Sequence, residues 1–130
     1  MNRPSVAVAS TWAQAVGYSR ATHAGDLIFV SGTTATGPDG KALHPGDAAA
    51  QAATVLDRIV AAIKELGAGP QHVVETRIYL TDMSSWQAVG RAHGLVFGEV
   101  RPATTIVQVG PLISPDLLVE ISAIASLATD

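Results

Sequence analysis

Hydrophobic and polar residues alternate with two different periods along the chain. Short apolar runs and period-two alternation predict strands over residues 18–23, 26–32, 73–80, 104–109 and 117–127. Apolar residues spaced three and four positions apart predict helices over residues 48–66 and 85–97. The order β-β-α-β-α-β-β is typical of an α+β fold, with a mixed sheet and two helices packed on one face. The other face of that sheet then needs cover, which we expect a second subunit to supply.

The first predicted helix has well-marked ends. Asp47 suits the N-cap position and Gly67 suits the position just after the C-terminus, where the backbone is often left-handed. The apolar positions between them are Ala52, Val55, Ile59, Ala62, Ile63 and Leu66. Polar residues, Gln51 among them, occupy the remaining positions, so this helix should be amphipathic and lie on the sheet.

Because side chains alternate between the two faces of a sheet, the sequence predicts which residues of two strands share a face. In the strand over 73–80, one face is expected to carry Val74, Thr76, Ile78 and Leu80. In the last strand, Val119, Ile121, Ala123 and Ala125 share one face, and Leu118, Glu120, Ser122 and Ile124 share the other. Glu120 is therefore a lone carboxylate in a hydrophobic strand.

Composition narrows the class of protein. With 130 residues and a mass of 13.3 kDa, the chain is expected to form a single domain over residues 1–130. The residues are 48% hydrophobic and only 15% charged, which excludes intrinsic disorder and suggests that an oligomer hides apolar surface. A net charge of −3 without a Lys/Arg cluster argues against a nucleic-acid partner.

Several kinds of chemistry have no support in the sequence. Cysteine is absent, which excludes disulfides and Cys-ligated metals, and the four histidines lack ligand spacing. No P-loop or Gly-x-Ser-x-Gly motif occurs. No segment is long enough for a membrane span, and residues 1–10 are too short and broken for a signal peptide, so a cytoplasmic protein is expected.

Two side chains are candidates for chemistry from the pattern alone. A carboxylate in an apolar strand needs a partner, a water or a substrate proton, so Glu120 suits a general acid or base. The alternative is that Glu120 lies at a sheet end or forms a structural pair with a basic residue. His93 lies on an apolar stripe of the second helix, flanked by Gly90 and Gly94. It is either a core histidine with one hydrogen bond or a polar group lining a pocket, and the two glycines indicate close approach of a backbone or ligand.

The ordered segments resemble the RidA/YjgF family, also called YjgF/YER/UK or L-PSP. The matching segments are Gly17-Tyr18-Ser19, residues 25–32, the helix with Leu66-Gly67-Ala68, residues 73–83, Arg101-Pro102-Ala103-Thr104-Thr105 and residues 118–125. The resemblance covers nearly all of the chain. It implies a chorismate-mutase-like α+β fold, a homotrimer with ligand sites in the clefts between subunits, and no cofactor or metal.

The resemblance also implies which residues form the site. Glu120 is the acid of the last strand, and Tyr18, Ser31 and Gly32 are the residues usual in the family. Five positions depart from the family. Thr33 stands where glutamine is common, Gly90 where asparagine is usual, and His93 at the usual tyrosine near that asparagine. Thr104 stands at the arginine that grips a substrate carboxylate, and Ser122 at a second acid of the last strand. A neutral Thr104 cannot replace that charged fork, which disfavours 2-aminoacrylate as the substrate. Arg101 lies three residues away and is either a solvated loop charge or a replacement.

Two functions remain open at this point. The first is a hydrolase that deaminates an enamine or imine intermediate in an intersubunit cleft, with Glu120 as acid or base and Tyr18, Ser31, Gly32, Thr33, Gly90, His93 and Thr104 around the substrate. The second is a trimeric protein that binds a small metabolite, or regulates a partner, without catalysis. A ribonuclease activity, attached to some family members, is disfavoured by the acidic composition.

Overall fold

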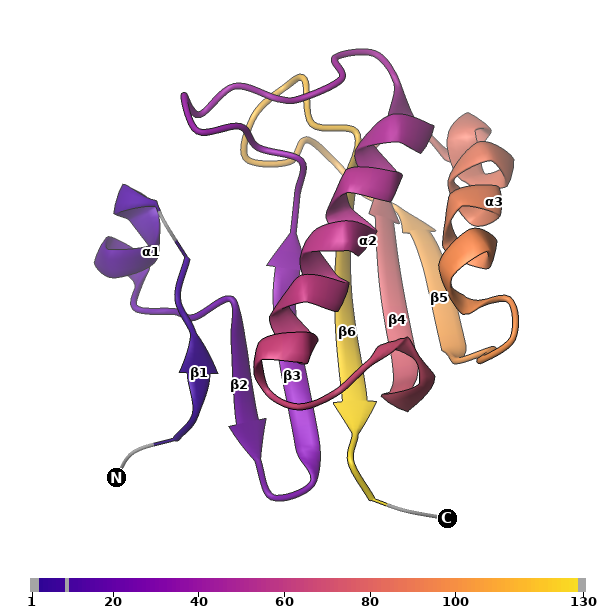
Figure 1. The fold of residues 1–130 in the computed structure, drawn as a ribbon. Helices are drawn as coiled ribbons and strands as arrows, with labels where there is room; N and C mark the ends of the chain where they lie inside the picture. The colour runs from indigo at the N-terminus through magenta and orange to yellow at the C-terminus, as the bar shows by residue number, and fades with distance from the viewer. Residues whose placement is uncertain (1–2, 9, 129–130) are drawn as a thin grey trace.

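One six-stranded sheet organises the chain in the computed structural model, which describes residues 3–8 and 10–128 (Figure 1). The strands are β1 (Ser5–Val6), β2 (Ala21–Ala24), β3 (Leu27–Thr33), β4 (Val73–Leu80), β5 (Ala103–Gln108) and β6 (Val119–Ser126). They lie side by side in the order β1-β2-β3-β6-β4-β5. Only the β4–β5 pair is parallel among the described strands, so the sheet is mixed as predicted.

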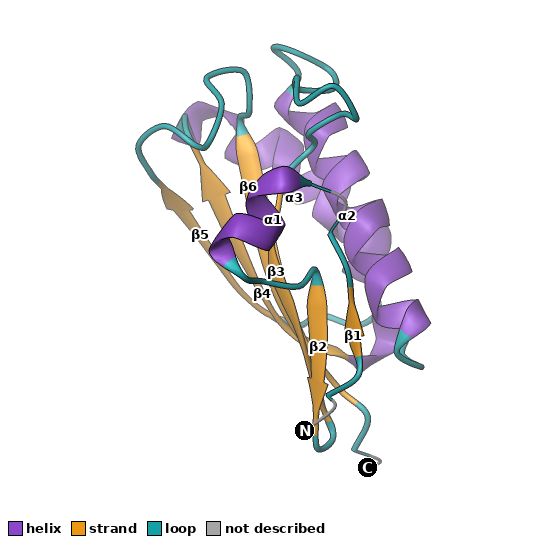
Figure 2. Cartoon of the chain, turned by 90° about the vertical axis from the view of Figure 1, so that its left-hand side faces the viewer, coloured by secondary structure: helices purple, strands orange, loops and turns teal. Residues whose placement is uncertain are grey.

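Two long helices cover one face of this sheet (Figure 2). They are α2 (Ala48–Glu65) and α3 (Trp86–Phe97); a short helix, α1 (Thr11–Val16), and two 3₁₀ turns (Pro70–His72 and Met83–Ser85) complete the described elements. The core lies between the helices and the sheet, where Val55, Ile59 and Ile63 of α2 join the same buried cluster as Ile78 and Ile121. This arrangement confirms the predicted α+β fold.

The ends of α2 form as the sequence predicts. The Asp47 side chain accepts a hydrogen bond from the Ala50 N–H at 3.0 Å. Gly67 follows the helix with φ of 91°, and the N–H of Ala68 reaches back to the Ile63 carbonyl at 2.9 Å. The helix therefore stops where a left-handed residue becomes available.

The predicted element order omits two elements near the N-terminus. β1 has two residues and α1 has six, too few for either to show a hydrophobic period. Local hydrogen bonds define α1: the Ser10 side chain accepts from the Ala13 N–H, and Gly17 ends the helix with φ of 85°. These elements matter because β1 pairs with β2 at the edge of the sheet (Figure 1), and Val6 of β1 and Trp12 of α1 line the candidate site described below.

The predicted faces are right for β6 and partly wrong for β4. Val119, Ile121 and Ala125 of β6 are fully buried, and Glu120 is half-buried on the other face. In β4, however, Val73 is 2% exposed and lies in the core, whereas Val74 is 48% exposed. A register shift between Val73 and Glu75 inserts one residue against β6 and reverses the parity at that end.

Gln51 lies in the core, which corrects its assignment to the polar side of the helix. The side chain is fully buried, and its amide connects two loops. Its Nε2 donates to the carbonyls of His44 at 3.2 Å and Asp116 at 2.9 Å, while its Oε1 accepts from the Leu118 N–H at 2.8 Å. The amide thereby holds the start of β6 against the start of α2, which a periodicity argument cannot foresee.

The sheet face opposite α2 and α3 carries exposed apolar side chains. Leu27 and Phe29 of β3 are 39% and 41% exposed, and Val107 of β5 is 38% exposed. The same face carries a surface ion pair in which Arg77 Nε lies 3.0 Å from Glu75 Oε1. Among the described residues, no helix combines the length and apolar character needed to cross a bilayer.

Candidate functional site

The Glu120 carboxylate lies against a residue that has no side chain. Glu120 is on β6, and its neighbour on β3 is Gly32, close to a register shift between Val30 and Thr33. A Cβ atom placed on Gly32 would overlap Glu120 Oε2 and lie 2.9 Å from its Cδ. The glycine therefore leaves the space that the carboxylate occupies. This is a close approach of the kind for which glycine is required.

Burial and one cation set the proton affinity of this carboxyl group. Partial desolvation raises the pKa of Glu120 above its ordinary value, because the charged form loses hydration. The positive charge of Arg20 acts in the opposite direction and is the smaller effect. A carboxyl group with a raised pKa is suited to both donating and accepting a proton.

Arg20 is held in place by its backbone and by the tip of its side chain. Its N–H donates to the Val6 carbonyl at 2.7 Å, and its carbonyl accepts from the Ser31 N–H at 2.9 Å. At the tip, Nη1 donates to Thr33 Oγ1 at 2.8 Å. Burial also lowers the pKa of Arg20 from its ordinary value. The guanidinium thus has a defined position next to Glu120.

Ser31 and Thr33 support this arrangement from β3. The Thr33 hydroxyl accepts from Arg20 and donates to the Ser31 carbonyl at 2.8 Å, and the Thr33 side chain is fully buried. Ser31 Oγ donates to the carbonyl of Ser19 at 2.7 Å. In this protomer both hydroxyls are engaged in hydrogen bonds within the protein, so they orient neighbouring groups.

A hollow of about 800 Å³ opens next to these groups. Its lining includes Tyr18, Arg20, Gly32 and Glu120, together with side chains from α1, α2 and the loop after β3. Trp12 of α1 donates its indole N–H to the Tyr18 hydroxyl at 2.9 Å, so an aromatic pair borders the hollow. The space is within the range typical of small-molecule sites.

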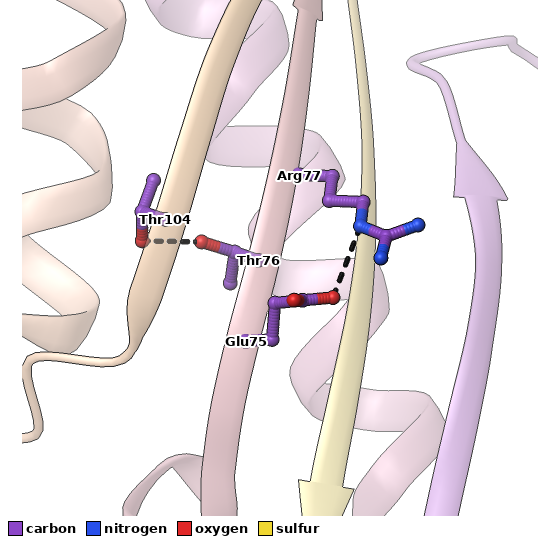
Figure 3. A network of polar contacts seen from close by, with 4 residues as sticks. All are labelled: Glu75, Thr76, Arg77 and Thr104. Atoms are coloured by element: carbon purple, nitrogen blue, oxygen red, sulfur yellow. Dashed lines mark hydrogen bonds and ion pairs between the residues drawn. The ribbon is translucent and has the colours of Figure 1, made fainter.

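The other predicted site residues form a second cluster around α3 and β5. The hydroxyl of Thr76, which is fully buried on β4, lies 2.7 Å from the Thr104 hydroxyl (Figure 3). The same hydroxyl lies 2.9 Å from His93 Nε2. The His93 ring also contacts Phe97, with 4.8 Å between ring centroids, and burial lowers the pKa of His93. The histidine is therefore held by one side-chain hydrogen bond in a largely apolar setting, which matches the structural alternative considered from the sequence.

The structure thus separates the eight predicted site residues within one protomer. Tyr18, Gly32 and Glu120 line the hollow, with Ser31 and Thr33 behind them, whereas Gly90, His93 and Thr104 do not line it. A Cβ on Gly90 or on Gly94 would meet nothing within 4 Å, so no described segment of this chain approaches either glycine closely. Arg101 is exposed and has a left-handed backbone, with φ of 58°.

Three residues of the site were missed from the sequence. Arg20 and Arg58 both line the hollow, and Thr76 joins the second cluster. Arg20 had one available signal: it stands two residues after Tyr18 in the strand predicted over residues 18–23, whose parity puts both side chains on the same side. Arg58 appeared only as a polar helix position. Among the described residues, no group of three or more His, Asp or Glu side chains could hold a metal ion.

Comparison with known proteins identifies the family. The family model described as "Endoribonuclease L-PSP" matches residues 9–127. The chain belongs to the endoribonuclease L-PSP family. This is the RidA/YjgF family that the sequence segments predicted.

Relatives and solved structures of the L-PSP family agree with this assignment. The 3-aminoacrylate deaminase RutC of Acinetobacter baylyi is 36% identical over 108 residues, which are 83% of this chain and 85% of RutC. The crystal structure of Rv2704, a YjgF/YER057c/UK114 family member from Mycobacterium tuberculosis, is 46% identical with a TM-score of 0.86, covering 96% of this chain and 99% of that one. The YjgF gene product of E. coli is 30% identical with a TM-score of 0.76, covering 85% and 88%.

Membership of the L-PSP family limits the functions that need to be considered. Together with the hollow and its carboxyl group, it supports a hydrolase-like or small-molecule-binding role. The arrangement within the hollow provides a proton donor and acceptor, a fixed cation and two aromatic rings, which are the groups needed to bind and protonate a small organic molecule.

Proposed function

We propose that the protein hydrolyses the C=N bond of a small enamine or imine, with Glu120 as the acid–base group. The observation that carries the proposal is the position of the Glu120 carboxyl: half-buried against Gly32, at the side of the hollow, with burial raising its pKa. The similarity to a relative named as a 3-aminoacrylate deaminase supports the same reaction class.

The reaction follows from one carboxyl group used twice. Protonated Glu120 donates its proton to the enamine carbon, which gives the iminium form of the substrate. The resulting carboxylate then accepts a proton from a water molecule as the water oxygen bonds to the C=N carbon. The carbinolamine nitrogen takes up this proton, the C–N bond breaks, and ammonia leaves as the carbonyl forms. Glu120 is returned to its protonated state when the hydroxyl proton is lost.

The proposed substrate-binding residues come from both clusters. Tyr18 and Gly32 line the hollow with Glu120 in one protomer, and Ser31 and Thr33 flank Gly32 on β3. We propose that Gly90, His93 and Thr104 reach the site from a neighbouring copy in a homotrimer. The exposed apolar side chains of Leu27, Phe29 and Val107 on the uncovered sheet face, and the open space at Gly90, support such an assembly.

The departure at Thr104 bears on the choice of substrate. Thr104 carries no charge, and its hydroxyl is hydrogen-bonded to Thr76 and to the Pro102 carbonyl. It cannot provide the arginine fork that the family resemblance implies at this position. We therefore propose a substrate other than 2-aminoacrylate, and the hollow of about 800 Å³ has room for a larger molecule.

The test is a panel of imines generated in place by an amino-acid oxidase, with ammonia release as the measurement. The wild-type protein should accelerate release, and Glu120→Gln should reduce the rate to background while the thermal unfolding curve is preserved. Glu75→Gln is the matched control, because Glu75 is a carboxylate on the same sheet face but pairs with Arg77 away from the hollow. Full activity of Glu120→Gln, or equal losses in both variants, would refute the mechanism.

A second candidate is a trimer that binds a small metabolite without turnover, which the uncharged Thr104 favours. In that case no imine of the panel would be hydrolysed above background. A ligand would nevertheless raise the unfolding temperature of the wild-type protein, because binding to the folded state stabilises it.

A further inference from the structure

Among the described residues, the Arg20 side chain has one hydrogen-bond partner, Thr33, and it borders the hollow. A guanidinium has five N–H donors in a fixed plane, and the Arg20 side chain uses one of its groups on Thr33. The side chain lines the hollow together with Glu120 and Tyr18. Because the side chain borders the hollow, its other donors are within reach of a ligand there, and a planar fork matches a carboxylate with two parallel hydrogen bonds.

The position of Arg20 is fixed before any ligand arrives. Its backbone is hydrogen-bonded to β1 on one side and to β3 on the other, and its Nη1 is bound to a fully buried hydroxyl. A long side chain normally loses rotamer freedom when it binds an anion. Here the side chain has already lost that conformational entropy on folding, so binding a carboxylate orders it little further.

The second arginine of the hollow is placed differently. Arg58 of α2 donates from Nη1 to the Thr34 carbonyl at 2.8 Å, so it fastens the strand end to the helix. Its charge lies close enough to contribute to lowering the pKa of Arg20. The acidic side chains Asp39 and Glu65 also border the hollow, but both are exposed, and Asp39 accepts a hydrogen bond from the Lys41 N–H. Water and salt screen such exposed charges.

We propose that Arg20 binds the carboxylate of the substrate, so that the site takes planar, conjugated carboxylic acids and their enamine or imine derivatives. The inference rests on the function proposed above and deepens it by naming the substrate class. The cation stands beside Glu120, and the Trp12–Tyr18 pair offers rings against which a flat molecule can stack. The positive charge that binds the carboxylate thus comes from Arg20, just before β2, and not from β5, where Thr104 is neutral.

The test measures binding and does not depend on turnover. The probes are phenylpyruvate, which has a carboxylate, and phenylacetone, which replaces it with a methyl group. Each is titrated calorimetrically into wild-type protein, Arg20→Gln, Arg20→Lys and the matched control Arg58→Gln. We expect Arg20→Gln to weaken the binding of phenylpyruvate at least about tenfold and to change the binding of phenylacetone less than about twofold. Arg20→Lys should weaken phenylpyruvate binding less than Arg20→Gln does, because lysine keeps the positive charge but lacks the planar fork.

A further variant tests whether the anion lies beside the acid–base group. At a pH high enough to ionise Glu120, the Glu120→Gln substitution removes a negative charge near Arg20 and should tighten phenylpyruvate binding while leaving phenylacetone binding unchanged. Unchanged phenylpyruvate binding in Arg20→Gln would overturn the inference. Loss of both probes in that variant would also overturn it, since Arg20 would then only keep the hollow open, as would failure of the wild-type protein to prefer the acid.

The binding test and the ammonia-release test can fail independently of each other. If phenylpyruvate binds through Arg20 but no imine is hydrolysed, the carboxylate site stands and the protein is a binder. If imines are hydrolysed with equal efficiency whether or not they carry a carboxylate, the reaction stands and the role of Arg20 is wrong.

Discussion

Gly32→Ala is the substitution that most directly tests the site geometry. The new Cβ would lie 2.9 Å from Glu120 Cδ and 3.3 Å from its Cγ. Since carbon atoms in contact normally stand about 3.5 Å apart or more, the carboxyl carbon must retreat by roughly 0.6 Å. The carboxylate is the free end of a flexible side chain, so it moves more easily than the sheet does. The variant therefore displaces Glu120 without removing it.

The expected effect is a loss of rate with little loss of stability. Misplacement of a reacting group by the order of 1 Å can cost about 100-fold in rate, so we expect kcat to fall by about 10- to 100-fold. The free energy of unfolding should change by less than about 1 kcal/mol, because alanine regains about 0.5–1 kcal/mol over glycine in a strand while a strained Glu120 rotamer costs a similar amount. Ammonia release and urea unfolding measure the two quantities.

Gly94→Ala is the control for this experiment. A Cβ there meets nothing within 4 Å, and the residue lies inside α3, so we expect about 1 kcal/mol of added stability and an unchanged rate. Full activity of Gly32→Ala would refute the reasoning, because the position of Glu120 would then not govern the reaction. Unfolding of Gly32→Ala would show that the close approach is needed for the fold itself.

Three further predictions follow from the same structure. Burial raises the pKa of Glu120, so above pH 4.5 the unfolded chain loses this proton before the folded protein does, and the free energy of unfolding falls until the raised pKa is passed. Glu120→Gln should remove that decline in urea unfolding between pH 4 and 8. Wild-type and variant stabilities that change with pH in parallel would contradict this prediction. Gln51→Leu removes the amide that binds three part-buried backbone groups and should cost about 3 kcal/mol in urea unfolding; a loss below about 1 kcal/mol would mean that water replaces the amide. Phe29→Asp places a charge on the uncovered sheet face and should convert the proposed trimer to monomer by native mass spectrometry, and an intact trimer would exclude that face from the interface.

The parts of the fold that the sequence predicts are those in which a period is long enough to read. The helix α2 and the strand β4 begin and end within one residue of the prediction, because caps and apolar spacing agree there. The parity at the start of β4 is wrong because a bulge depends on the pairing with β6, which the sequence of one strand does not encode. β1 and α1 are too short to leave a pattern.

The candidate site could be predicted only in part for a similar reason. Glu120 stands out in its own strand, whereas its partner Arg20 lies 100 positions away, so nothing local links them. Their proximity depends on β6 pairing with β3 and on the extended segment that leads into β2. The family resemblance groups Gly90, His93 and Thr104 with Glu120, but within one protomer His93 and Thr104 contact Thr76 instead, and Gly90 lies on α3 with His93.

Gly32 and the Glu120 carboxylate beside it belong to different strands, β3 and β6, which pair through main-chain hydrogen bonds. Their alignment is consequently inherited from the ladder between β3 and β6, and a slip of a single residue would carry the acid to the opposite side of the sheet. The residues that line the hollow can therefore be substituted without moving Glu120, provided that no residue is inserted into or deleted from β3 or β6.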